Sequence, residues 1–286
     1  MKSTSAKTLV GSQSGLKFAT SPRWNRQKLL FLDAHDRCIK SVDLEGTVQT
    51  VKTLPYVPGG LGLLTAGGLI VGDAWRRKVY RYASADPDQM IVLSDVAKFC
   101  LTDVIVDNRD ATYVCDVGFN YLDPLVDPVA NGVIVHINAN GQPIVVARNL
   151  LFPNGMAISP DNKTLIVSES LGHRLTAFEI NGDGSLQDRR VWAQFQDDVK
   201  PGGLCLDQEG AIWVAGTTPG VLRVKEGGKS DRLITTKQPA FATMLGGPER
   251  RHLFICTAAS EDPVVTRRVS SATIDIAEVE IPGSDS

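Results

Sequence analysis

Two similar turns in the sequence differ at the position from which a side chain would project. Residues 151–170 read LFPNGMAISPDNKTLIVSES, and residues 199–216 read VKPGGLCLDQEGAIWVAG. Both stretches predict a turn, a strand, a tight turn and a second strand. The first turn carries Asn154, whose amide can orient a substrate or ligate a cation, whereas the second carries Gly202, which offers only backbone groups. If such turns surround a common site, its chemistry depends on which turns keep a functional side chain.

Three further residues could carry acid–base chemistry. Desolvation can turn a carboxylate into an effective base, which makes Asp103 and Asp73 candidates, and the imidazole of His35 can exchange protons near neutral pH. Each also has a structural explanation, because an Asp in a turn often accepts backbone N–H bonds and a loop His is often a solvated surface residue. We retain Asp103, His35 and Asp73 as candidate catalytic residues.

The composition limits the class of partner. The chain has 286 residues, of which 43% are hydrophobic, so it can bury a full core, and its formal net charge is −2. A charge so near zero argues against nucleic acid or an anionic membrane as partner and favours a small molecule. The N-terminal stretch MKSTSAKTLVGSQSG has no apolar run that would make a secretory signal or a membrane anchor. Five widely spaced cysteines predict buried thiols and a cytoplasmic location.

The elements that must position the candidate residues repeat along the chain. Six units, each starting with a turn and an apolar strand, follow one another at intervals of roughly forty to fifty residues, a period typical of propeller blades. Period-two alternation and β-branched residues predict strands, and no segment has a sustained helical stripe. We therefore predict an all-β chain that forms a single six-bladed β-propeller domain over 1–286, with a pair of β-sandwiches as the alternative. The stretches KTLVG and TIDIAEVEI alternate well enough to close the ring by pairing.

In an antiparallel meander, the start of the first strand and the loop between the second and third strands lie on one face. That face of the predicted ring brings together small or polar residues at the centre and aromatic residues that could line the walls, a combination that suits an apolar ligand oriented by a few polar groups. An insertion over residues 117–132 is long enough to act as a lid. The candidate substrate-binding residues on this face are Asn154, Thr20, Thr102, Gly202, Trp75, Phe119, Asn120, Phe152, Glu169 and His173.

Several phrases of the sequence, each at its own blade, carry a resemblance to a known family. They are SPRW, LTDVIVD, FPNGMAISPDNKTLIVSES, HRLTAFEINGDGSL, GGLCLDQEGAIWVA and FATMLGGPERRHLFICTAAS. Together they resemble the family of senescence marker protein, gluconolactonase and luciferin-regenerating enzyme over nearly the whole chain. The resemblance implies a six-bladed propeller with one divalent cation, often calcium or zinc, at the mouth of the channel. It also implies hydrolysis of lactones or related esters.

The family's metal site is depleted in this sequence. Where the family begins its first blade with Glu-Gly-Pro-x-Trp and uses the Glu as a ligand, this chain reads TSPRW, so that Thr20 stands at the Glu position. Thr102 stands where the family has an Asn before Asp103, and Asn154 matches the family's amide ligand. Gly202 stands where the family has an Asp that binds the metal and acts as a base.

Two carboxylates are therefore missing from the implied ligand set. Hard cations need several oxygen ligands, and their affinity follows the number of charged ones. Losing even about 4 kcal/mol lowers affinity roughly a thousandfold. We expect no cofactor, and a calcium or zinc ion would be held weakly, with Asn154 as a ligand only if a metal is bound. Replacement ligands from His35, Asp73, Asp103 or Glu169 remain the alternative.

Several functional interpretations stay open at this point. The first is an enzyme for a fairly apolar small molecule, a hydrolase of a lactone, an ester or another ring-opening substrate that works with little or no metal. The alternatives are a metal-dependent lactonase with rearranged ligands, a metal-free lyase or isomerase, and a ligand-binding pseudoenzyme. Fold alone does not choose among them.

Overall fold

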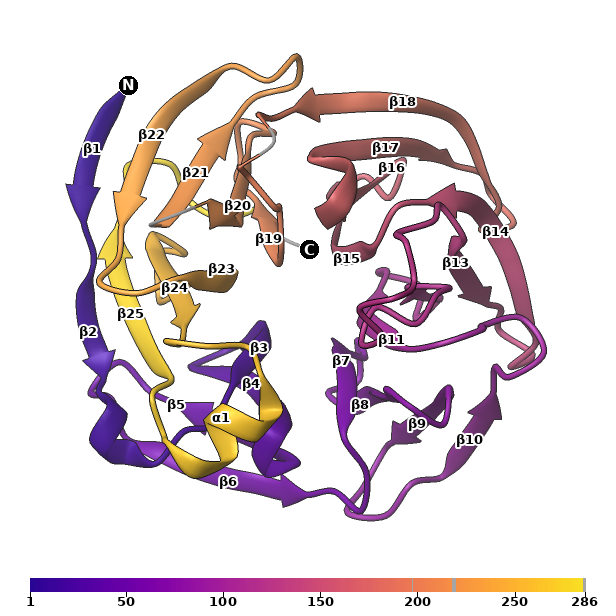
Figure 1. Cartoon of the computed structure of the whole chain (residues 1–286), viewed down its shortest axis with the longest axis horizontal. Helices are drawn as coiled ribbons and strands as arrows, with labels where there is room; N and C mark the ends of the chain where they lie inside the picture. Colours follow the sequence, from indigo (N-terminus) through magenta and orange to yellow (C-terminus); the bar gives the residue numbers. More distant parts are fainter. Residues whose placement is uncertain (197, 218–219, 285–286) are drawn as a thin grey trace.

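Short strands with alternating burial build the molecule. The computed structural model describes residues 1–196, 198–217 and 220–284, and these residues form six sheets arranged in a ring (Figure 1). Each sheet is a blade whose first strand lies nearest the centre of the ring (Figure 1). The fold is a six-bladed β-propeller, which confirms the all-β prediction.

The first three blades follow the chain without interruption. Blade 1 consists of β3 (Ala19–Asn25), β4 (Lys28–Asp33), β5 (Cys38–Val42) and β6 (Val48–Thr53). Blade 2 consists of β7 (Pro58–Leu63), β8 (Leu69–Asp73), β9 (Lys78–Tyr82) and β10 (Gln89–Val92). Blade 3 consists of β11 (Leu101–Val106), β12 (Thr112–Asp116), β13 (Gly132–Ile137) and β14 (Pro143–Leu150).

The last three blades include the strand that closes the ring. Blade 4 consists of β15 (Pro153–Ile158), β16 (Thr164–Glu169), β17 (Arg174–Ile180) and β18 (Leu186–Gln194). Blade 5 consists of β19 (Leu204–Leu206), β20 (Ile212–Thr217), β21 (Gly220–Val224), β22 (Ser230–Thr235) and β1 (Lys2–Ser5). Blade 6 consists of β23 (Ala240–Gly246), β24 (His252–Thr257), β25 (Thr273–Glu278) and β2 (Lys7–Val10).

The ring is closed by the N-terminal segment. β2 pairs antiparallel with β25, as the alternation of both stretches predicts. β1 in addition pairs parallel with β22 of blade 5, which the sequence pattern does not indicate. The N-terminal segment therefore joins the last two blades and covers the edges of β22 and β25.

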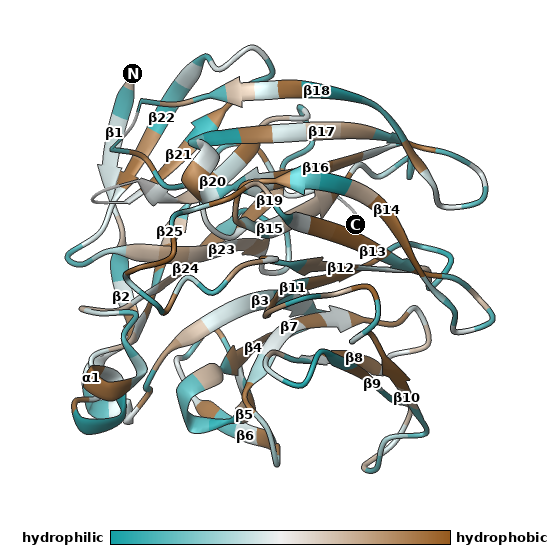
Figure 2. Ribbon diagram, turned by 45° about the vertical axis from the view of Figure 1, so that its right-hand side comes forward, coloured by the Kyte–Doolittle hydropathy of each residue, from teal (hydrophilic) through white to brown (hydrophobic). Residues whose placement is uncertain are grey.

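The hydrophobic core lies in layers between neighbouring blades. One apolar cluster joins blades 1 and 2 through Leu32 and Leu61, and another joins blades 2 and 3 through Val79 and Val104. Because the side chains of a strand alternate between its two faces, each blade contributes one set to the layer before it and one to the layer after it. Figure 2 shows hydrophobic residues, in brown, within strands such as β10 and β13 and hydrophilic residues, in teal, in many of the connecting loops.

Helical structure in the described residues is confined to short segments. The α-helix α1 (Pro263–Arg268) lies between β24 and β25, and 3-10 turns cover Ser12–Ser14, Ala34–Asp36 and Ser170–Gly172. Asp262 caps α1 by accepting a hydrogen bond from the Val264 N–H at 2.7 Å. None of the helices in the described residues is long and apolar enough to cross a membrane. The five cysteines lie buried as free thiols.

Candidate active site at the channel mouth

Irregular first strands shape one end of the central channel. In the described part of the chain, five first strands carry a shift of register near their start, at Thr20, Pro58, Leu101, Pro153 and Ala240. Such bulges re-aim side chains next to functional sites. We call this end the channel mouth and define it by Thr20, Ser21, Thr102, Asp103, Asn154 and Gly202.

A buried ion pair lies just inside the channel mouth. Arg23 of β3 donates from Nη2 to Asp103 Oδ1 at 3.0 Å and to the carbonyl oxygen of Val104 at 2.9 Å. The other carboxylate oxygen of Asp103 accepts from the backbone N–H of Met156 at 3.0 Å. Because Asp103 is only 5% exposed, burial raises its pKa above the usual range, against the opposing effects of Arg23 and the Met156 N–H.

Glycines of blade 2 allow this pair to form between strands that are not neighbours. The pair joins β3 to β11, with β7 between them in the ring (Figure 1). A Cβ on Gly60 of β7 would lie 2.4 Å from the Val104 nitrogen, so a side chain there would push β11 away. The glycine pair in PGGLGL therefore serves close packing of the first strands.

The neutral residues of the channel mouth are linked by hydrogen bonds. Thr102 donates to the Pro153 carbonyl at 2.8 Å, and Asn154 Nδ2 donates to the hydroxyl of Ser170 at 3.2 Å. Ser170 in turn donates to the Pro201 carbonyl at 2.7 Å. The structure thus brings Thr102, Asn154 and the loop before Gly202 together, and Thr20 lies partly buried at the start of β3.

The backbone around Gly202 leaves no room for a side chain. A Cβ built on Gly202 would lie 2.6 Å from the carbonyl oxygen of Phe241, which also accepts a hydrogen bond from the Gly203 N–H at 2.9 Å. An Asp cannot be placed here without moving Phe241 or the turn. The absence of a carboxylate at this position is therefore built into the local backbone.

The candidate acids Asp73 and Glu169 lie at the ends of second strands, where they are engaged by their own blades. Asp73 accepts from the Arg76 N–H at 3.1 Å, and its side chain lies 3.5 Å from the Arg76 guanidinium. Glu169 accepts from Arg174 at 2.8 Å and from the Leu151 N–H at 2.7 Å. Burial alone would raise the pKa of Glu169, but its hydrogen bonds to Arg174, Thr176 and the Leu151 N–H hold it below the usual range.

The two candidate histidines lie in loops between second and third strands. His35 stacks on Phe18 with ring centroids 4.7 Å apart, and its Nδ1 lies 2.6 Å from the Thr266 hydroxyl of α1. Burial, with Arg267 nearby, lowers the pKa of His35 to about 4, so that its ring is neutral at neutral pH. His173 Nδ1 hydrogen-bonds to the Val199 carbonyl oxygen at 2.8 Å.

Aromatic residues form a continuous arc beside the channel mouth. Each ring meets the next edge-on, with centroids 5.7 Å apart for Trp75 and Phe99, 5.6 Å for Phe99 and Tyr121, and 5.0 Å for Tyr121 and Phe152. Phe119 meets Phe152 at 6.2 Å. The insertion over residues 117–132 supplies Phe119 and Tyr121, and its Asn120 accepts from the Leu122 N–H at 3.2 Å. The arc therefore joins blades 2, 3 and 4.

The residues present do not fit a tightly bound divalent cation. In 1–196, 198–217 and 220–284 there is no group of three or more His, Cys, Asp or Glu side chains that could hold a metal ion. Asp103 is the carboxylate of the channel mouth, and Arg23 already compensates its charge. Thr20, Thr102 and Asn154 offer only neutral oxygens.

Arg23 is the residue of the candidate site that sequence reasoning missed. It occupies the variable position of the SPRW phrase, and its partner Asp103 lies 80 positions further along the chain. The available signal was a basic residue on an inner strand of a propeller, where side chains face the channel or a neighbouring blade. The helix α1, which supplies Thr266 to His35, was missed as well.

Comparison with known proteins agrees with the fold and the quoted phrases. The family model for the SMP-30/Gluconolactonase/LRE-like region matches residues 18–259, and the chain belongs to this family. The luciferin-regenerating enzyme has a solved structure similar to this one, with a TM-score of 0.79 at 16% identity, covering 97% of this chain and 96% of that one. At this identity the likeness establishes the fold.

Curated relatives match over shorter stretches. Regucalcin of Xenopus laevis is 30% identical over 162 residues, 48% of this chain and 54% of the regucalcin. The 6-deoxy-6-sulfogluconolactonase of Pseudomonas putida is 26% identical over 132 residues, 44% of this chain and 45% of that enzyme. The chain thus spans about half the length of these curated relatives.

Proposed function

We propose that this chain is a lactonase-type hydrolase that opens small, fairly apolar lactones or esters at the channel mouth with little or no bound metal. Its family membership and its similarity to a 6-deoxy-6-sulfogluconolactonase support the reaction class. The observation that carries the metal-light mechanism is the Arg23–Asp103 ion pair just inside the channel mouth.

Electrostatics favour the guanidinium over a metal ion. Asp103 already has a compensating positive charge at 3.0 Å, so that a divalent cation approaching the same carboxylate would be repelled by Arg23. A doubly charged ion and a guanidinium about 5 Å apart repel by several kcal/mol even at an effective dielectric constant of about 20. The loss of two carboxylates and the positive charge of Arg23 both lower the affinity of the site for a divalent cation.

The proposed mechanism uses Asp103 as the general base. Asp103 takes a proton from water while the water oxygen attacks the carbonyl carbon of the lactone. The ring C–O bond then breaks, and the leaving alkoxide takes up that proton, which gives the open hydroxy acid. Burial raises the pKa of Asp103 and makes it a stronger base than a solvated carboxylate, while the positive charge of Arg23 opposes that rise and its hydrogen bond orients the carboxylate. Asn154 has a second amide N–H that can bind the substrate carbonyl oxygen.

The aromatic arc indicates the substrate class. Trp75 is 38% exposed and Tyr121 is 37% exposed, so that apolar ring surface is available to a ligand at this face. Sugar lactones present hydroxyl groups that need polar partners, whereas an aromatic or alkyl lactone buries its body against such rings. We therefore expect dihydrocoumarin to be a better substrate than glucono-δ-lactone.

The test compares these two lactones with and without a chelator. The protein is purified without added metal, and the kcat/KM of each lactone is measured before and after treatment with EDTA and after addition of calcium or zinc. We expect dihydrocoumarin hydrolysis to be at least tenfold more efficient and unchanged by EDTA. Loss of activity with EDTA and its recovery with metal would instead establish the lactonase with rearranged ligands. Tight ligand binding with no turnover would establish the pseudoenzyme.

A further inference from the structure

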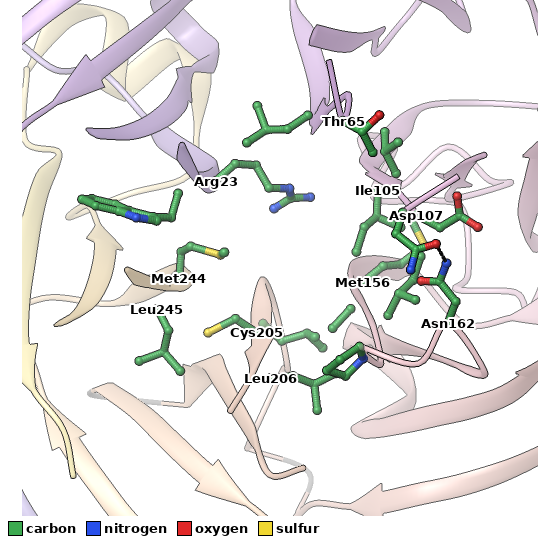
Figure 3. Close-up of a pocket in the computed structure, with 18 of the residues that line it drawn as sticks. Arg23, Thr65, Ile105, Asp107, Met156, Asn162, Cys205, Leu206, Met244 and Leu245 are labelled. Carbon is green, nitrogen blue, oxygen red and sulfur yellow. Dashed lines mark hydrogen bonds between the residues drawn. The ribbon is translucent and has the colours of Figure 1, made fainter. Parts of the chain in front are cut away.

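The central channel has a second opening at the end opposite the channel mouth. There the later residues of the first strands and the turns that follow them enclose a cavity of about 290 Å³. We call it the lower cavity and define it by Arg23, Ile105, Met156, Asn162, Leu206 and Met244 (Figure 3). None of the six residues that define the channel mouth lines the lower cavity, and Arg23, whose partner Asp103 belongs to the mouth, lies between the two.

The body of the lower cavity is apolar. Ile105, Met156, Leu206 and Met244 come from four different blades and surround the same space (Figure 3). Met side chains adapt to ligands of irregular shape because they are unbranched and polarizable. A cavity walled in this way favours the hydrocarbon part of a ligand and disfavours a sugar or a nucleotide.

Arg23 supplies a polar group at the inner end of the lower cavity. Its guanidinium points toward the middle of the space (Figure 3). It donates three hydrogen bonds, to the carbonyl oxygens of Pro22 and Val104 and to Asp103. Since a guanidinium has five N–H groups, two remain for an oxygen acceptor of a ligand. The charge of Arg23 is matched by Asp103, so a neutral carbonyl oxygen or a carboxylate could fill this role.

The rim of the lower cavity is made of polar turn residues, of which Thr65 and Asn108 are exposed and Asn162 is half-buried. Thr65, Asn108 and Asn162 lie in turns between first and second strands, and Asn162 donates a hydrogen bond to Asn108 (Figure 3). These turns lie at the opposite ends of the strands from Asp73 and His35. A ligand therefore enters the lower cavity from solvent on the face away from the channel mouth.

The volume sets the size of the ligand. An apolar protein cavity of about 150 Å³ is known to hold one benzene molecule. By proportion, the lower cavity holds roughly a dozen non-hydrogen atoms. We propose that it binds a small apolar molecule of this size that ends in a carbonyl or carboxylate oxygen, with the oxygen on Arg23 and the hydrocarbon between Met156 and Met244.

The lower cavity lies on the opposite face of the ring from the proposed active site and is lined by different residues. Ligand binding in it requires no catalysis, so a failure of the protein to hydrolyse lactones would not contradict this proposal. The chain also provides an internal probe, because two of its four methionines, Met156 and Met244, line the lower cavity. The other two are Met1 at the N-terminus and Met90 on the outer strand β10.

The experiment is a titration of the full chain labelled with ¹³C at the methionine methyl groups. The probes are 4-phenylbutyrate, its neutral analogue 4-phenylbutanamide, and butylbenzene, which lacks an oxygen. We expect the Met156 and Met244 signals to shift with saturation while those of Met1 and Met90 stay in place. At least one of the oxygen-bearing probes should bind about tenfold or more tightly than butylbenzene, as a hydrogen bond to a charged group implies. The charged and neutral probes distinguish the two kinds of terminal oxygen.

Variants test the location and the role of the guanidinium. Ile105→Trp fills the lower cavity and should abolish the shifts for all three probes. Val191→Trp, a matched change at an exposed position on β18, should leave them unchanged. Arg23→Met should weaken the oxygen-bearing probes about tenfold and leave butylbenzene unaffected. Unmoved Met156 and Met244 signals, binding that survives Ile105→Trp, or equal affinity for butylbenzene would each overturn the proposal.

Discussion

At the scale of single residues, one arginine compensates the charge of the buried carboxylate of the channel mouth. A carboxylate that is buried without a partner is unfavourable by several kcal/mol, and a metal ion or a basic side chain can compensate it. In this chain Arg23 does so for Asp103. The same guanidinium lies between the channel mouth and the lower cavity, so that one ion pair adjoins both proposed sites.

Asp103→Asn tests the proposed base directly. The amide keeps the shape of the side chain but cannot take a proton from water, so kcat with dihydrocoumarin should fall by about a hundredfold or more. The protein should remain folded, with a loss of roughly 3 kcal/mol because Arg23 is left without its anion. Circular dichroism and urea unfolding measure the fold, and single-turnover kinetics measure the rate.

The double variant Arg23→Met/Asp103→Asn serves as the control for stability. Removing both charges should recover most of the stability lost in Asp103→Asn, because no unpaired charge remains, but it should not recover the rate. A rate for Asp103→Asn equal to that of the parent protein would remove Asp103 from the mechanism.

His35 gives a prediction about acid stability. Its folded pKa of about 4 lies below the ordinary value of 6.5, so the unfolded chain takes up the proton first as the pH falls. The contribution of His35 is complete above pH 6.5 and is lost progressively between pH 6.5 and 4. Because the ring is partly exposed, we expect a loss of about 1–2 kcal/mol.

The measurement for His35 is the difference in unfolding free energy between the parent protein and His35→Gln across this pH range. Glutamine keeps a hydrogen-bonding group near Thr266 but does not titrate. The difference should shrink as the pH falls from 6.5 to 4. A constant difference would mean that His35 is protonated equally easily in both states.

At the scale of elements, buried carboxylates at the ends of second strands tie each strand to the segment that enters its blade. Asp33 accepts from the N–H groups of Lys17 and Phe18, and Asp116 accepts from those of Lys98 and Phe99. Glu169 does the same with Leu151 in blade 4. The repetition of this contact in three blades assigns these acids to folding of the blade.

Asp116→Ala measures this contact. It leaves two backbone N–H groups without their acceptor, which should lower the free energy of unfolding by about 2–4 kcal/mol. Asp161→Ala is the matched control, because Asp161 also accepts a backbone N–H, from Lys163, but at an exposed turn. It should cost less than about 1 kcal/mol. Equal losses in the two variants, determined by urea unfolding, would contradict a special role for the buried acid.

The elements were predictable from local patterns and the contacts between them were not. Alternation and turn residues predict the strands of all six blades, because these signals lie within a few residues of each other. The Asp262–Pro263 start of α1 is also a local signal, but six residues are too few for a helical stripe. Asp73 and Glu169 were predicted in loops between second and third strands and lie next to those loops, as the last residues of β8 and β16, whereas their partners depend on side-chain direction. The partner of Asp103 lies on another blade, which no local pattern indicates.

At the scale of the whole molecule, the ring is closed by strands from both ends of the chain. β2 supplies the outer strand of blade 6, and Val10 at its end is buried in the apolar cluster between blades 5, 6 and 1. β1 is exposed and adds a fifth strand to the outer edge of blade 5. The two adjoining segments should therefore differ greatly in their contribution to stability.

Two N-terminal truncations separate these contributions. Removal of residues 1–10 deletes β1 and β2, leaves one edge of β25 without a partner strand and exposes the apolar cluster that Val10 covers. The free energy of unfolding should fall by about 3–5 kcal/mol, from one buried side chain and several hydrogen bonds. For a chain of this size that corresponds to a decrease of roughly 10 °C in Tm. Removal of residues 1–5 deletes only β1 and should lower the Tm by no more than about 3 °C. The free edge of β25 should in addition make the chain without residues 1–10 aggregate at lower concentration. Equal melting temperatures for the two truncated chains would show that β2 does not hold the ring closed.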